Sequence, residues 1–320
     1  MKYVIGAYTA YPATPDWDDS AESAFLADLA QLPGFGGLEV PFTGPLPADT
    51  GLFDKVDPSW DFVLTAIPGT IPRVAADPNF GLASPAPDGR REALVFAAGL
   101  RDAVEQWQRW AGRACVRGVE IHSAPTGIAD GAAFTDSLAE IASWDWHGAT
   151  VTVEHCDAFV PERAPQKGYL DLSAELAAIA AVVAQGPRTR LGLTVNWARS
   201  AIEAHDAGIA ATHIGQAAAA GALRGLMFSG CSDRAGAFGD AWLDTHLPPA
   251  AGEFDDLTNV QPESLLTPDE VRRAIAATAG QPLDFAGLKI GVRPADASPA
   301  TRVAYLRDAL RLLDRALQRP

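Results

Sequence analysis

The 320-residue sequence predicts a single (β/α)8 barrel, the TIM barrel fold, on three observations. Short apolar runs typical of strands alternate with longer Ala- and Leu-rich runs typical of helices. Eight such units recur at an average spacing of 40 residues, as in a barrel of this class. A doubly wound sheet is the main alternative, but Gly34-Phe35-Gly36-Gly37 precedes a strand instead of linking a strand to a helix. One domain spanning residues 1–320 is therefore expected.

The predicted strands are runs of five to ten residues, rich in aliphatic and β-branched side chains. In chain order they are Val4–Tyr8, Gly36–Phe42, Asp61–Ile67, Arg117–Ala124, Ala149–Ala158, Leu191–Trp197, Arg224–Ser232 and Gly287–Pro294. The long segments between most of them leave room for helices, so consecutive strands are expected to lie parallel and to close on themselves.

The predicted helices are Ala21–Leu32, Glu92–Ala111, Ala132–Trp144, Ala174–Ala184, Ala210–Ala220, Pro268–Ala279 and Pro299–Leu317. Thr267 to Glu270 has the pattern of a capping box, with proline at the first helical position. Gly44–Pro58 holds too many proline and glycine residues for a long helix. The longest irregular stretch, Asp233–Leu266, follows the seventh strand, and a loop of that length is usually functional.

Charge and composition indicate which classes of binding partner to expect. The net charge is −15, with 40 acidic and 25 basic residues and no basic run, which argues against nucleic acids and anionic membranes. No apolar run reaches the ~18 residues of a membrane span, and the N-terminus lacks a signal-peptide pattern. The three cysteines have no Cys-x-x-Cys spacing. A cytoplasmic protein with a small, weakly charged substrate is expected, and its oligomeric state stays open.

Strand alternation predicts which side chains face the barrel axis. In the fifth strand, Val151 and Val153 face the helices, which turns Glu154 inward. The same rule gives a set of inward polar residues: Glu39, Glu120, His122, Thr152, Cys156, Thr194, Asn196, Ser229, Cys231, Lys289 and Arg293. Most lie near the C-terminal strand ends, where barrel active sites form. The alternative is a buried structural ion-pair network, with Glu120 only orienting its neighbours.

The remaining histidines follow the same reasoning. His155 is expected to face the helices and to have a structural role. Three others lie on or near predicted helices, where solvated or capping roles are expected: His147, His205 and His213.

Two short motifs carry a family resemblance. VTVEHCDA around Glu154 resembles the fifth strand of the xylose isomerase-like TIM barrels, and GGLEVPF around Glu39 resembles their Gly-x-x-Glu strand end. That superfamily includes sugar isomerases and epimerases, inosose dehydratases and endonuclease IV enzymes, and its members commonly bind a divalent metal. The resemblance implies a Zn²⁺ or Mn²⁺ site formed by Glu154, His122 and an Asp-x-His pair, Asp244 and His246.

The sequence departs from the family pattern at several ligand positions. Asn196 and Arg199 stand where the family has Asp and His on the sixth strand. Ser229 and Lys289 stand near its strand-seven His and strand-eight Glu. These changes remove ligand charge and add cations. A second possibility is therefore that Lys289, with Arg199, takes the place of the metal and polarises a substrate oxygen.

The leading functional hypothesis is a sugar or polyol isomerase or epimerase. Glu154 would remove a proton alpha to a carbonyl, Lys289 or a metal would stabilise the enediolate, and Glu39 or His122 would relay the proton. The residues expected to bind the substrate are Asn196, Trp197, Arg199, Ser229, Arg293 and Trp17. A lyase or hydrolase acting on a modified sugar, and a sugar-binding barrel that has lost its activity, remain as alternatives.

Overall fold

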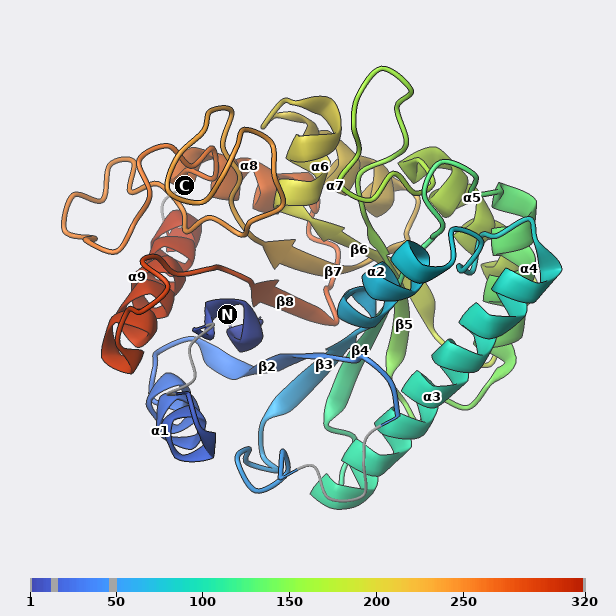
Figure 1. The fold of residues 1–320 in the computed structure, drawn as a ribbon, viewed down its shortest axis with the longest axis horizontal. Coiled ribbons are helices and arrows are strands. Elements are labelled where there is room, and N and C mark those ends of the chain that lie inside the picture. The colour runs from blue at the N-terminus through green and yellow to red at the C-terminus, as the bar shows by residue number, and fades with distance from the viewer. Residues whose placement is uncertain (1, 13–16, 46–50, 319–320) are drawn as a thin grey trace.

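The computed structural model describes residues 2–12, 17–45 and 51–318, and its eight parallel strands form a closed barrel (Figure 1). The strands are β1 (Tyr3–Ile5), β2 (Phe35–Pro41), β3 (Asp61–Thr65), β4 (Val116–Ile121), β5 (Thr150–His155), β6 (Leu191–Asn196), β7 (Leu223–Phe228) and β8 (Phe285–Leu288). Each strand pairs with its neighbours in sequence, and β8 pairs with β1. The predicted (β/α)8 fold is confirmed.

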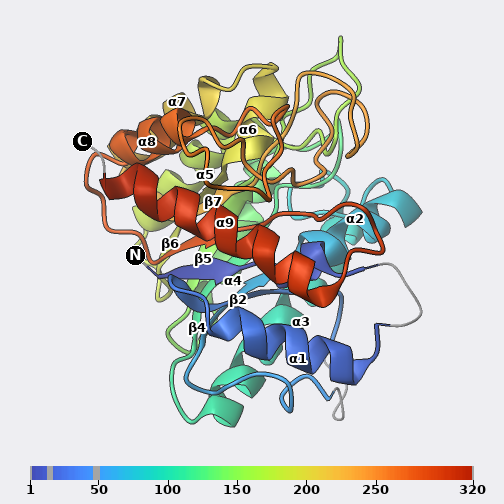
Figure 2. The same cartoon turned by 90° about the vertical axis from the view of Figure 1, so that its left-hand side faces the viewer.

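Helices surround the strands, as Figure 1 shows. They are α1 (Asp19–Ala30), α2 (Ile67–Ala76), α3 (Pro87–Ala111), α4 (Gly131–Ser143), α5 (Leu172–Val183), α6 (Trp197–Ala204), α7 (Ile209–Ala219), α8 (Pro268–Ala277) and α9 (Pro299–Gln318). A short 3-10 helix, η1 (Ala7–Ala10), follows β1. The first and last helices, α1 and α9, pack side by side (Figure 2). The predicted cap at Thr267 forms, because Glu270 N donates a hydrogen bond to Thr267 Oγ1. The Glu270 side chain pairs with Arg273, so only this one of the two capping-box hydrogen bonds is present.

Several predicted boundaries are wrong at the C-terminal strand ends. The predicted strand Asp61–Ile67 ends at Thr65, and Ile67 begins α2. Likewise Trp197, the predicted end of the sixth strand, begins α6. Both helices were missed because each begins within two residues of the end of the strand before it, so no turn segment marks the change from strand to helix. The structure describes no helix between β2 and β3 over the described part of Gly44–Pro58; residues 46–50 of that segment lie outside the described residues.

The barrel interior has an apolar part and a polar part. Val4, Val63, Met227 and Phe285 form an apolar cluster of their own inside the barrel. Two glycines make room for the Phe285 ring, because a Cβ at Gly118 or Gly225 would lie 2.4 or 2.5 Å from it. The polar part lies toward the C-terminal strand ends. The glycines of the strands thus let a large ring fill the axis, while charged side chains occupy the rest.

Two loops meet over the C-terminal end of the barrel. In Figure 2 the loop after β7 (orange) lies beside the loop between β5 and α5 (green). The former is also tied to the end of β8, because Gly291 N donates a hydrogen bond to His246 O at 2.6 Å. Among the described residues, no helix combines the length and apolarity that crossing a membrane requires.

Candidate active site

Glu154, near the end of β5, is the centre of a buried polar cluster. Its Oε2 lies 2.7 Å from Arg199 Nη1 and 2.9 Å from His122 Nε2. Its Oε1 accepts a hydrogen bond from Asn196 Nδ2 at 3.3 Å, and Ser229 Oγ donates to Asn196 Oδ1 at 3.0 Å. All five side chains are buried, as the alternation rule predicts for the four that lie on or just after strands.

Lys289, one residue beyond β8, joins three carboxyl groups. Its Nζ lies 2.6 Å from Glu39 Oε1 and 3.8 Å from Glu154 Oε1. Oxygens of Glu39, Glu120 and Glu154 all lie within 4.8 Å of one another. Gly6, which follows β1, leaves the space for this contact, since a Cβ there would lie 2.6 Å from Glu39 Oε2.

Burial and neighbouring charges give these acids different protonation. Burial opposes ionisation of Glu154, but the charges of Arg199 and Lys289 hold its pKa well below the usual range. Burial and the charge of Glu154 raise the pKa of Glu120 well above normal, so Glu120 is the protonated member. Burial disfavours a charged Lys289, but Glu154 and Glu39 raise its pKa. Burial lowers the pKa of His122 to about 4, which leaves the imidazole neutral at pH 7.

Asp244, from the loop after β7, covers this cluster. Its carboxylate pairs with Lys167 and lies 3.4 Å from Arg199 Nε. His246 Nδ1 lies 3.3 Å from Asp244 Oδ1. Lys167 is itself held by the Asp157 carboxylate, which accepts hydrogen bonds from the backbone nitrogens of residues 166–168. Ion pairs therefore close the mouth of the barrel over Glu154.

Three predicted site residues lie elsewhere. Arg293 was expected to face the axis, but β8 ends at Leu288 and the alternation extends only to Lys289. The Arg293 side chain is exposed, with its guanidinium 5.1 Å from the Phe238 ring. Trp17 packs against Tyr11 and Phe25, with ring centroids 5.4 and 5.5 Å apart. Trp197 is fully buried in the main apolar core.

Two residues of the cluster were not anticipated. The Tyr8 ring lies 5.9 Å from Lys289 Nζ. The strand β1 ends at Ile5 and Tyr8 belongs to the 3-10 helix η1, so strand alternation gives no direction for its side chain. Lys167 belongs to an irregular loop, where no periodicity indicates the direction of its side chain.

His213 was expected to be solvated or to cap a helix, but it is buried on α7, because that position faces β5.

The four predicted metal ligands do not meet at one point. The Arg199 guanidinium contacts both Glu154 and Asp244 and lies where an ion shared by them would have to bind. The Lys289 ammonium likewise occupies the group of three carboxyls, where it would repel a divalent cation. Within the described residues, two groups place three His or acidic ligand atoms within 4.8 Å of one another: Glu39, Glu120 and Glu154, and His155, Glu203 and His213.

Residues 4–305 match the family defined by a domain of unknown function, DUF4862. The chain belongs to this family. An uncharacterized protein of Salmonella typhimurium, STM3670, is 34% identical to it over 325 residues, which cover 99% of this chain and 98% of the relative.

Solved structures similar to the DUF4862 chain share its fold at low identity. A putative xylose isomerase from Rhodospirillum rubrum aligns with a TM-score of 0.61 and 12% identity, over 98% of each chain. The Escherichia coli 3-keto-D-glucoside 4-epimerase gives 0.54 and 12%, over 98% of this chain and 100% of the epimerase. A family 2 AP endonuclease from Brucella melitensis gives 0.54 and 15%, over 94% and 96%. The resemblance to xylose isomerase-like barrels is confirmed for the fold.

Proposed function

We propose that the DUF4862 chain is a sugar isomerase or epimerase that moves a proton on the carbon next to a carbonyl group. The observation that supports this is the group of three carboxyls within 4.8 Å, in which neighbouring cations hold the pKa of Glu154 low while burial and the charge of Glu154 raise the pKa of Glu120. Carboxyl groups whose environments push their pKa values apart can supply a base and an acid in one site.

In the proposed reaction, Glu154 takes the proton as the C–H bond breaks, and the electron pair moves onto the carbonyl oxygen. The Lys289 ammonium donates a hydrogen bond to that oxygen and compensates its developing charge. As Lys289 interacts with the oxyanion, its electrostatic stabilisation of the Glu154 carboxylate decreases. The carboxylate therefore becomes a stronger base. Glu120, whose carboxyl lies within 4.8 Å of those of Glu39 and Glu154, supplies the proton that returns to carbon. His122, neutral and bonded to Glu154, fixes its orientation.

We further propose that Lys289 supplies the positive charge for which the family resemblance implied Zn²⁺ or Mn²⁺. Two cations, Lys289 and Arg199, already face Glu154. Asn196 and Ser229 offer hydrogen bonds to substrate hydroxyls. We keep a small carbohydrate as the expected substrate, because the net charge of −15 opposes binding to nucleic acid. The Lys167–Asp244 ion pair must open to admit it, since the residues around Glu154 are buried.

The test is exchange of the substrate proton with solvent deuterium. The protein is incubated in D₂O with a panel of aldoses, ketoses and keto-sugars, and deuterium at the carbon next to the carbonyl is measured by NMR. Glu154→Gln is expected to slow exchange by about 10²–10⁴-fold. Glu140→Gln, the same change on an exposed position of α4, is the control and leaves the rate unchanged.

Other outcomes would contradict the proposal. Exchange at the wild-type rate in Glu154→Gln would show that Glu154 is not the base. A product that has lost water would identify a lyase, since isomerisation conserves the molecular formula. Saturable binding of a sugar without any exchange would identify a binding barrel.

A further inference from the structure

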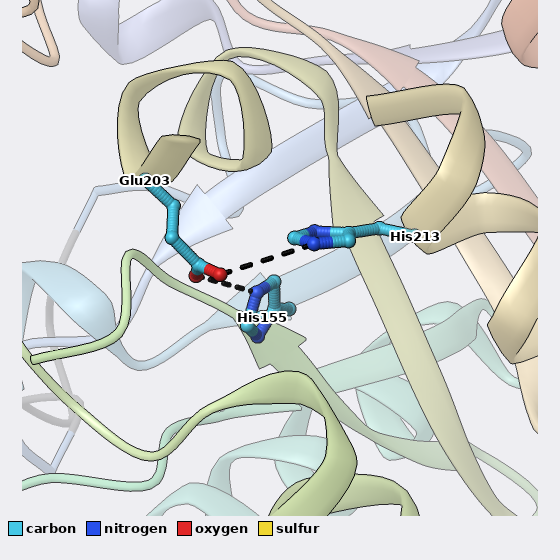
Figure 3. Close-up of side chains that lie close together, drawn as sticks. All are labelled: His155, Glu203 and His213. Atoms are coloured by element: carbon cyan, nitrogen blue, oxygen red, sulfur yellow. Dashed lines mark hydrogen bonds and ion pairs between the residues drawn. The ribbon is translucent and has the colours of Figure 1, made fainter. Parts of the chain in front are cut away.

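A second buried cluster lies on the outer side of β5, facing the helices. Figure 3 shows His155, Glu203 and His213, from β5, α6 and α7, converging on one point. His155 Nε2 lies 3.0 Å from Glu203 Oε2, and His213 Nε2 lies 3.8 Å from Glu203 Oε1. A tetrahedral Zn²⁺ ion with bonds of about 2.0–2.1 Å separates its ligand atoms by about 3.3 Å. The two observed distances end on different oxygens of the Glu203 carboxylate, and the three residues bring one ligand atom each within 4.8 Å of the others, so small side-chain rotations would give that spacing.

Both histidines are held through their other ring nitrogen. His155 Nδ1 lies 2.7 Å from Glu175 Oε2, and His213 Nδ1 lies 3.0 Å from Ser200 Oγ. Metal-binding histidines almost always have such a partner on the nitrogen that does not face the metal, because it fixes the tautomer and the ring orientation. The supports for a metal site are therefore in place.

The charges in this cluster do not balance. Without a metal, both ring nitrogens of His155 face carboxylate oxygens, so the ring is an imidazolium between Glu175 and Glu203. In the part of the chain that the structure describes, no Lys or Arg pairs with either carboxylate. Two buried carboxyl groups thus share one cationic partner, and burial raises the pKa of Glu175. A divalent ion in place of the proton on Nε2 would balance them.

We propose that His155 Nε2, His213 Nε2 and the Glu203 carboxylate form a Zn²⁺ site that joins β5, α6 and α7. Two imidazoles and one carboxylate are a donor set that suits Zn²⁺. Glu203 also lines a cavity of about 280 Å³ beside the loop after β7, so the carboxylate side of the proposed site adjoins this cavity. The site does not depend on the proposed sugar chemistry.

Zinc titration of the metal-free full-length chain tests the proposal. After treatment with a chelator, calorimetry is expected to show saturable binding of one Zn²⁺, and Co²⁺ should give the visible absorption of a tetrahedral complex. His213→Ala is expected to weaken binding by at least about 100-fold, and Ser200→Ala by about 10-fold through loss of the support on Nδ1. His147→Asn, a change to a histidine outside the cluster, is the control.

Thermal unfolding of each variant shows whether it is folded. If His213→Ala is not folded, weaker zinc binding in Glu203→Gln and Ser200→Ala tests the proposal instead. The proposal is overturned if the wild-type chain shows no saturable binding. It is also overturned if zinc binding survives His213→Ala but is lost in Glu120→Gln, which would assign the ion to the central carboxyls.

Discussion

Replacing Lys289 by methionine removes the ammonium while keeping a side chain of similar length. At an effective dielectric constant of about 20, its contacts at 2.6 Å with Glu39 and 3.8 Å with Glu154 amount to about 6 and 4 kcal/mol of Coulomb attraction. Desolvation of the buried charges offsets much of this. Removing one partner of a buried ion pair therefore costs a net of about 3–5 kcal/mol.

Urea unfolding at pH 7.5 measures the effect, and an unchanged dependence on urea shows that the folded state keeps its compactness. We expect Lys289→Met to lower the free energy of unfolding by about 3–5 kcal/mol. In the double variant Glu39→Gln/Lys289→Met the loss should shrink, because one carboxylate is gone and Glu154 keeps Arg199 at 2.7 Å.

The double-variant cycle decides whether the pair is coupled. A coupling energy of about 2–3 kcal/mol between Glu39 and Lys289 is expected from their direct contact. A loss below about 1 kcal/mol in Lys289→Met, or losses that simply add in the double variant, would refute the conclusion that the Lys289 ammonium compensates the buried carboxylates.

Three further predictions concern neighbouring positions. Gly6→Ala should lower the free energy of unfolding by about 1–3 kcal/mol, because its Cβ would lie 2.6 Å from Glu39 Oε2; an unchanged urea midpoint would contradict this. Arg293→Ala should change the free energy of unfolding by no more than about 0.5 kcal/mol and leave the exchange activity unchanged, because the residue is exposed. Loss of activity would show that Arg293 takes part in the site after all. The pKa of His122 is about 4 in the folded chain and about 6.5 unfolded, so its contribution is complete above pH 6.5 and is lost toward pH 4. Urea unfolding at several pH values should show a fall in the free energy of unfolding of up to about 3 kcal/mol. The dependence of this free energy on pH should be weaker in His122→Gln, and an equal dependence in both proteins would contradict the prediction.

The inward residues of the strands could be predicted because a strand has a period of two and one face of each strand packs against helices. That rule places Glu39, Glu120, Glu154 and Asn196 inside the barrel, and the structure finds all four buried. It fails at Arg293, because the rule holds only while the backbone stays extended.

Residues on loops were predictable in type but not in place. The Asp-x-His pair indicated that Asp244 matters, yet the sequence contained no sign that its partners would be Lys167 and Arg199. Those contacts depend on how two loops far apart in the chain pack over the barrel mouth. Helix α6 was missed for a related reason: Asn196 is both the last residue of β6 and the N-cap of α6, so no turn segment separates the two elements, and its side chain makes no capping hydrogen bond.

Glu154 and His155 are consecutive residues whose side chains point to opposite faces of β5. On the inner face, the carboxylates of Glu154 and Glu39 are balanced by Lys289 and Arg199, so no charge is left for a divalent ion. On the outer face, the two carboxylates around His155 lack one positive charge. Helix α6 takes part in both, because Arg199 contacts Glu154 and Glu203 contacts His155. An ion bound on the outer face would therefore fix the helix that positions a cation beside Glu154, without contacting Glu154 itself.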